Sequence, residues 1–280
     1  MDDGYPVYAG VKGINWSTLR EMNVSPQHYR WRLDNPPEET PSMTLGRAIH
    51  TAVLEPDRFP LDYVVWDGGR KAGQAYEDFK AVNAGRTILK LEEYEQALAI
   101  RDAVRSHRDA RRYLRRGKPE QTLTWVDAAT GLPCKARLDW LAPRWLLELK
   151  STRSIDEREW RNTVTYSLYY GQLAFYRMGL RAQHPRRKAP AVKLIAVENC
   201  APYEVVVFDV PDEVLDAGED LAASLLARVK ECRARKSWPG RYSGEQTLSL
   251  PGWAYPPIDP DAVDPDDIIT ILKGASRERA

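Results

Sequence analysis

The spacing of hydrophobic and polar residues changes along the chain, and each spacing predicts a type of secondary structure. In five segments, apolar and aromatic residues recur at helical intervals, which predicts amphipathic helices. These segments are 16–33, the stretch between Pro41 and Pro56, 91–116, 157–180 and 212–236. The first has a break at Pro26, and Ser42 or Thr44 could cap the second. The polar, glycine-containing stretch 67–87 predicts a loop around a short helix.

A spacing of two residues marks the middle of the chain and predicts strands. Three such segments, 120–126, 132–141 and 145–151, are bounded by turn residues and by Pro143. Their close succession predicts an antiparallel meander. Two further strands are expected at 191–199 and 203–210.

The charge distribution leaves a nucleic-acid partner open. The 280 residues carry a net charge of +1. Between residues 101 and 118, however, basic side chains strongly outnumber acidic ones, whereas 259–267 contains acids and no base. A chain that is neutral overall can still present a basic face to phosphates, although a solvated charged helix gives the same pattern.

Composition predicts a cytoplasmic protein with a sizeable core. The chain is 43% hydrophobic, no apolar run approaches the ~20 residues of a membrane span, and the N-terminus lacks the pattern of a signal peptide. The cysteines (Cys134, Cys200 and Cys232) are isolated, so neither a disulfide framework nor a zinc or iron–sulfur cluster is expected. We expect one domain over 1–236, with a helical part at 1–118 and a core at 119–236. The proline-rich, acidic stretch 237–280 is expected to form an extended arm.

Asp139, Glu148 and Lys150 form the strongest candidate site. Residues two apart in a strand share a face, so Glu148 and Lys150 point together while Leu147 and Leu149 point into the core. Asp139 joins them if the loop between the strands has an even number of residues or a bulge corrects the parity; a three-residue loop without a bulge puts it on the other face. Two carboxylates can hold Mg²⁺ or Mn²⁺, and an ammonium can orient a water or stabilise developing charge. An exposed strand with a salt bridge would give the same spacing.

Four other residues could support this site. His50 lies one helical turn after Gly46, and Gln172 and Tyr176 are again four residues apart on a later helix. Glu120 opens the first strand of the meander and could add a carboxylate. Each also has an ordinary structural interpretation, as a helix residue or a surface acid.

Four short motifs contain or adjoin these residues and follow one another along most of the chain. They are Leu-Gly-Arg-Ala-Ile-His at 45–50, Cys-Lys-Ala-Arg-Leu-Asp at 134–139, Glu-Leu-Lys-Ser-Thr at 148–152 and Tyr-Gly-Gln-Leu-Ala-Phe-Tyr at 170–176. In this common order, the motifs resemble the RecE-type (exonuclease VIII-like) branch of the PD-(D/E)XK nucleases, to which the RecB nuclease domain and lambda exonuclease are related. The chain departs from the family at Leu138, where the family name has proline, and at Glu148, where RecE-like relatives often carry Asp.

The resemblance implies a fold and a role for each site residue. The fold is a restriction-endonuclease-like α/β core with a central mixed sheet flanked by helices. Asp139 and Glu148 would bind Mg²⁺, or Mn²⁺, together with the Leu149 carbonyl, and His50 would bind the metal or orient its water. Lys150 would position the attacking water, and Glu120 would join the metal shell. The residues expected to support the site or contact DNA are Gln172, Tyr176, Arg137, Arg111, Arg112 and Arg115.

The implied reaction is hydrolysis of phosphodiester bonds that leaves 5′-phosphate ends. The resemblance further implies 5′→3′ digestion of linear double-stranded DNA from its ends, exposing 3′ single strands. The protein would form ring-shaped homo-oligomers, and its partner would be a single-strand annealing protein. No membrane partner is expected. Two alternatives remain open: an endonuclease for single-stranded or branched DNA, and a non-catalytic DNA-end-binding protein. A small-molecule enzyme finds little support, because the sequence has no Gly-rich phosphate loop, nucleophile elbow or dinucleotide fingerprint.

Overall fold

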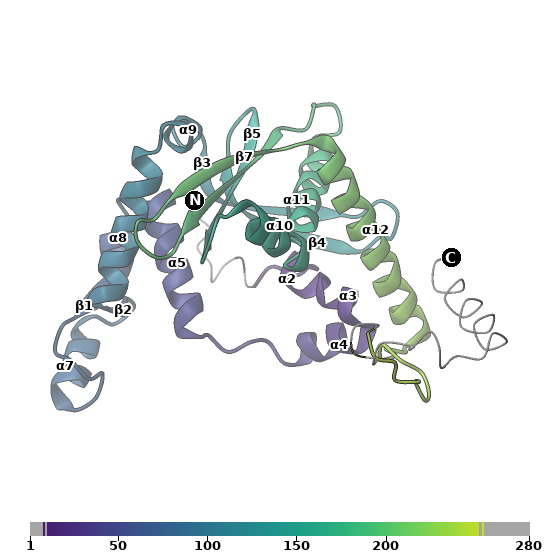
Figure 1. Cartoon of the computed structure of the whole chain (residues 1–280), viewed down its shortest axis with the longest axis horizontal. Coiled ribbons are helices and arrows are strands. Elements are labelled where there is room, and N and C mark those ends of the chain that lie inside the picture. Colours follow the sequence, from purple (N-terminus) through teal and green to yellow (C-terminus); the bar gives the residue numbers. More distant parts are fainter. Residues whose placement is uncertain (1–7, 9, 252–253, 255–280) are drawn as a thin grey trace, which may run out of the picture. The chain divides into compact units, whose positions relative to one another are not determined.

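The computed structural model of the chain describes residues 8, 10–251 and 254 (Figure 1). It divides into two compact units, of which the first ends at Arg241 and the second begins at Tyr242. All helices and strands named below belong to the first unit. In the second unit, residues 242–251 contain neither helix nor strand. The acidic run at 259–267 lies outside the described residues.

A five-stranded mixed sheet forms the centre of the first unit, with the strand order β3-β4-β5-β6-β7. The strands are β3 (Lys118–Val126), β4 (Pro133–Leu141), β5 (Trp145–Thr152), β6 (Ala191–Glu198) and β7 (Val205–Val210). The first three pair as the predicted antiparallel meander. β5 and β6 are parallel, which requires the long helical crossover between them. β7 returns antiparallel to β6.

Helices cover both faces of this sheet, because its strands present apolar side chains on both sides. In β5, for example, Leu146 packs in one core cluster while Leu147 and Leu149 pack in the other. The first cluster involves α2 (Trp16–Leu19), α3 (Glu21–Val24), α4 (Pro26–Asp34), α10 (Glu157–Tyr166), α11 (Tyr169–Gln183) and α12 (Asp212–Arg235). The second involves α5 (Pro41–Leu54), α6 (Phe59–Asp62), α8 (Leu91–Ser106) and α9 (Arg108–Tyr113). Figure 1 shows α11 and α12 on one side of the sheet and α5 and α8 on the other. The expected mixed sheet flanked by helices is therefore confirmed.

Three predicted helices differ in their boundaries. The segment 91–116, expected as one helix, divides at His107 into α8 and α9. α5 is capped by Thr40, whose side chain accepts a hydrogen bond from the Met43 amide at 3.2 Å, so the prediction of Ser42 or Thr44 was wrong. Pro41 sets this start, since its fixed φ and missing N–H suit the first helical position. The segment 157–180, expected as one helix, divides at Leu168, which adopts a left-handed φ of 55°. No glycine marks this break.

A small two-stranded sheet was not predicted. β1 (Tyr63–Trp66) and β2 (Thr87–Lys90) pair in parallel and flank α7 (Gln74–Val82), the short helix expected within 67–87. Each strand has four residues, which is too short to show a period of two. In the described part of the chain, no helix combines the length and apolar character needed to cross a membrane.

Candidate active site

The register between β4 and β5 places Asp139 opposite Glu148. The paired residues are Trp140 with Leu147 and Leu141 with Leu146, and continuing this register by one step aligns the two carboxylates. The strand bounds leave three residues between the strands, 142–144. Because Leu141 pairs with Leu146, however, four residues separate the first paired positions. This even number satisfies the parity condition that the sequence left open.

The β4–β5 ladder ends at Trp140–Leu147, just before the two carboxylates. Two residues further along β5, the Leu149 amide donates to Asp139 Oδ2 at 2.8 Å. In β4, Leu138 packs in one core cluster and Trp140 in the other, so the alternation of faces breaks at Asp139. Asp139 thus lies where the two strands stop pairing, and its other oxygen is directed to the site. Leu149 contacts the site through its amide, and its role as a carbonyl ligand stays a prediction.

Glu120 lies opposite Asp139 on the neighbouring strand. The β3–β4 register is the same on both sides of this position, since Pro119 pairs with Trp140 and Gln121 with Leu138. Glu120 itself has a φ of 53°, a conformation that is rare for a residue with a side chain and persists only where its surroundings hold it. The Arg137 Nε atom lies 2.5 Å from Glu120 Oε2. Arg137 therefore supports the site by fixing a carboxylate.

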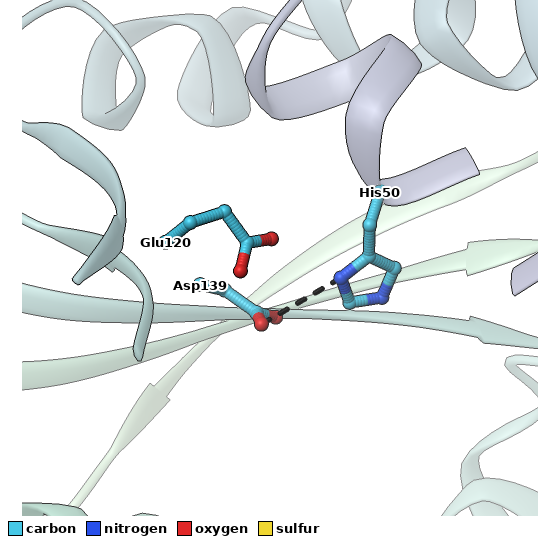
Figure 2. Close-up of side chains that lie close together, drawn as sticks. All are labelled: His50, Glu120 and Asp139. Carbon is cyan, nitrogen blue, oxygen red and sulfur yellow. Dashed lines mark ion pairs between the residues drawn. The ribbon is translucent and has the colours of Figure 1, made fainter. Parts of the chain in front are cut away.

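His50 reaches the carboxylates from α5, across the sheet face that this helix covers. Its Nδ1 lies 3.6 Å from Asp139 Oδ1. Figure 2 shows the imidazole and the Glu120 and Asp139 side chains converging on one point. One ligand atom from each of these three residues lies within 4.8 Å of the other two. The neighbouring strands β3 and β4 and the helix α5, which lies far before them in the sequence, thus contribute to one cluster.

Glu148 and Lys150 adjoin this cluster on β5. Lys150 Nζ donates to Glu148 Oε1 at 2.5 Å and lies 4.9 Å from the centre of the Tyr169 ring. Glu148 is 1% exposed, and among the described residues nothing donates a hydrogen bond to its Oε2. The alternative of an exposed strand with a surface salt bridge is therefore wrong. Tyr169 carried no signal in the sequence, because one aromatic residue at a helix start is ordinary.

Gln172 and Tyr176 lie on α11, and Tyr176 is close to Glu148 and Asp139. Gln172 Nε2 donates to Tyr176 Oη at 2.7 Å. Burial, followed by the Glu148 and Asp139 carboxylates, raises the pKa of Tyr176 well above its ordinary value. The phenol consequently stays protonated and can act as a donor.

Electrostatics in the site favour a bound cation. Burial and then the charge of Asp139 raise the pKa of Glu120 and of Glu148 to about 7. Burial alone would raise the pKa of Asp139, but His50, Lys150 and the Leu149 amide hold it below its ordinary value. Three carboxylates are therefore held closer together than their mutual repulsion favours, and positive charge would stabilise them.

The donor set fits a hard divalent ion. Oxygen ligands with one imidazole suit Mg²⁺ or Mn²⁺. The Glu148 Oε2 atom supports this assignment independently, because a buried carboxylate oxygen without a donor costs about 1–3 kcal/mol or more. His50, Glu120, Asp139 and Glu148 are the residues that would hold the ion.

A cavity of about 360 Å³ opens onto this cluster. Besides the site residues, it is lined by side chains of α5, of the turn after it, of α6 and of β1, to which the sequence assigned no role in the site. These are Arg47, Thr51, Glu55, Arg58, Asp62 and Tyr63. Arg47 lies within the Leu-Gly-Arg-Ala-Ile-His motif, so the sequence places it near His50. The direction of its side chain, however, depends on how α5 crosses the sheet.

The arginines expected to contact DNA are not brought to the carboxylates. Arg111 and Arg112 lie exposed on α9, and Arg115 follows it. This helix packs at the beginning of β5, where the Tyr113 carbonyl accepts a hydrogen bond from Trp145 Nε1 at 3.1 Å. Their role in DNA binding stays a prediction.

Comparisons with known proteins agree with this architecture. A family described as a PDDEXK-like domain of unknown function (DUF3799) matches residues 15–248. A crystal structure from Eubacterium rectale, described as a "putative exonuclease", is similar over 89% of this chain and 96% of its own, with a TM-score of 0.59 and 15% identity. At that identity the likeness shows the fold. No curated protein matches the sequence.

Proposed function

Because the chain belongs to the family of PDDEXK-like domains, we propose that it is a metal-dependent nuclease that hydrolyses phosphodiester bonds. The observation that carries the proposal is the convergence of Asp139, Glu120 and His50 beside the Glu148–Lys150 pair. The family supplies the fold, and these side chains supply the chemistry that a nuclease needs.

The residues divide into those that hold an ion and those that act on the substrate. Asp139, Glu120, Glu148 and His50 would hold Mg²⁺ or Mn²⁺. When bound, such an ion polarises a phosphoryl oxygen and lowers the pKa of a water ligand. Arg137 and the Leu149 amide fix Glu120 and Asp139, so the ligands need little reorganisation.

Lys150 acts on the reacting groups. Its ammonium, fixed by Glu148 and the Tyr169 ring, positions the attacking water and stabilises negative charge that develops on the phosphate. The water oxygen bonds to phosphorus while the bond from phosphorus to the 3′ oxygen breaks. The water proton leaves to solvent, and the 3′ oxygen takes one up. The products are a 5′-phosphate and a 3′-hydroxyl, and Tyr176 can donate to a phosphate oxygen throughout.

The proposed substrate is linear double-stranded DNA, digested from its 5′ ends to expose 3′ single strands. The order of motifs shared with RecE-type nucleases supports this choice, as does the description of the similar crystal structure as a "putative exonuclease". A ring-shaped homo-oligomer and a single-strand annealing protein belong to the same proposal. Sedimentation of the purified chain, alone and with DNA, measures the oligomeric state.

Digestion of end-labelled DNA tests the substrate. The protein is incubated with Mg²⁺ or Mn²⁺ and linear duplex carrying one 5′ label, beside closed circular DNA and a Lys150→Ala control. We expect release of labelled nucleotides from linear DNA, an intact circle and an inert variant. If the circle is cut as well, the protein is an endonuclease that uses the same site. Equal inactivity of both proteins with either metal would favour a non-catalytic DNA-binding protein.

A further inference from the structure

A second cavity, of about 470 Å³, lies at the end of the β3–β4 ribbon and has a basic lining. We call it the basic pocket. Its lining includes five side chains that are cationic or can become so: Arg116, Lys118, His184, Arg187 and Lys188. None of the described residues that line it is acidic. In a chain whose net charge is only +1, this is a marked local excess of positive charge.

Among the residues that the structure describes, no acidic neighbour pairs with the arginines and lysines of the basic pocket. Arg116, Lys118, Arg187 and Lys188 are all exposed, and within the described part of the chain none forms an ion pair. Many other basic residues of the chain do. Arg161, for example, pairs with Glu157 on α10 and Arg235 with Glu231 on α12. The basic pocket therefore holds charge that is available to an external anion.

Two segments far apart in sequence form the pocket, which is why the sequence did not reveal it. Arg116 and Lys118 end the basic run, with Lys118 as the first residue of β3, whereas His184, Arg187 and Lys188 follow α11. The β4–β5 turn lies between them, and the Arg144 carbonyl in this turn accepts a hydrogen bond from the Ala191 amide at 3.0 Å. Apolar side chains, Leu141 and Leu180 among them, complete the lining.

The basic pocket adjoins the Glu148 side of the site along α11. Tyr176 of this helix lies beside Glu148, and Leu180, which lines the pocket, follows it by one helical turn. At about 1.5 Å of rise per residue, the two positions are roughly 6 Å apart along the helix axis. A polyanion with one phosphate beside Tyr176 and Glu148 can therefore place further phosphates at the pocket.

We propose that the basic pocket binds backbone phosphates of the DNA strand on one side of the scissile bond. The inference rests on the proposed nuclease function and names the surface along which its substrate lies. Contacts from arginine and lysine to phosphates position DNA and are independent of base sequence, and each contributes to the salt dependence of binding. Binding at the pocket does not require the metal.

DNA binding in EDTA tests the proposal without cleavage. The Arg187→Gln/Lys188→Gln variant is compared with Arg161→Gln/Arg235→Gln, which removes the same charge from exposed positions on α10 and α12. Affinity for two short labelled duplexes of unrelated sequence is measured by fluorescence anisotropy over a range of salt concentrations. A competition arm uses inorganic phosphate.

We expect the pocket variant to bind both duplexes about tenfold or more weakly near 0.1 M salt, and to reduce the slope of log affinity against log salt by about 2. The α10 and α12 variant should match the wild type. Equal affinities for all three proteins, or equal losses in both variants, would overturn the proposal. The proposal would also be overturned if the pocket variant lost binding of inorganic phosphate but kept its DNA affinity, because the pocket would then be a site for free phosphate. Normal DNA binding by a wild type that never cleaves would instead refute the nuclease function.

Discussion

At the scale of single residues, Asp139 has two roles that substitutions can separate. One oxygen accepts a hydrogen bond from the Leu149 amide and so links β4 to β5 where their backbone pairing ends. The other oxygen faces His50. The first role needs only an acceptor, whereas the second needs the negative charge. The residue is therefore both a structural link between two strands and a candidate metal ligand.

Replacing Asp139 by Asn or by Ala should give different stabilities but the same loss of metal binding. Asn keeps an acceptor for Leu149, whereas Ala leaves that buried amide unpaired, so Asp139→Ala should be about 1–3 kcal/mol less stable than Asp139→Asn in EDTA. Both should lower Mn²⁺ affinity at least tenfold, measured by calorimetry. Asp209→Asn, which alters an exposed carboxylate on β7, is the control. Unchanged Mn²⁺ affinity in both variants would exclude Asp139 as a ligand.

At the scale of elements, α11 and α12 approach each other closely at Gly218. A Cβ atom there would lie 2.5 Å from the Tyr170 carbonyl oxygen and 2.7 Å from Ala174 Cβ. Arg177 joins the same two helices through Asp212, Asp216 and Glu219. Since α11 carries Gln172 and Tyr176, this packing fixes one wall of the site.

Gly218→Ala and Gly46→Ala should shift stability in opposite directions. Alanine gains up to about 1 kcal/mol of helix propensity at either position. At Gly218 the overpacking cost, about 1–3 kcal/mol or more, outweighs this gain, so the variant should unfold at lower denaturant concentration. At Gly46 nothing lies within 4 Å of the added carbon, so stability should rise. A stabilised Gly218→Ala variant would show that the helices pack less closely.

The pattern of the sequence predicted most elements because they are long enough to show a period. β3, β4 and β5 appear where the two-residue alternation lies, and Glu148 and Lys150 lie together as their spacing suggested, whereas the position of Asp139 depended on the register. The break between α10 and α11 depends on the left-handed conformation of Leu168, and no glycine in the sequence predicts that conformation. The parity of the β4–β5 loop and the contact of Arg137 with Glu120 follow from register and from tertiary packing, which a local pattern does not contain.

At the scale of the whole molecule, the first compact unit extends beyond the last long helix. Trp238 stacks on Tyr29 with ring centres 5.5 Å apart, and the Gln27 amide donates to the Pro239 carbonyl at 3.1 Å. Arg241 Nε donates to the Val24 carbonyl at 3.3 Å. The segment 237–241 thus packs on α3 and α4, which refines where the expected arm begins.

Truncation at two nearby points tests this boundary. Ending the chain after Arg241 should leave the unfolding midpoint and Mn²⁺ binding of the first unit unchanged. Ending it after Lys236 removes the Trp238 contact and should cost about 1–3 kcal/mol. Denaturant titration followed by tryptophan fluorescence and circular dichroism measures both. Equal stability of the two truncated chains would show that residues 237–241 contribute nothing to the unit.

The central claim, that Lys150 and the neighbouring carboxylates form a metal-dependent hydrolytic site, is tested most directly by a matched pair of lysine substitutions. Lys150 and Lys193 lie on adjacent strands, are similarly buried, and each contacts a carboxylate at 2.5 Å, but only Lys150 adjoins Asp139. The rate of duplex DNA cleavage is measured with Mg²⁺ and with EDTA. We predict metal-dependent cleavage by the wild type and Lys193→Ala, and at least a hundredfold loss in Lys150→Ala. Cleavage by Lys150→Ala at the rate of the wild type would contradict the account.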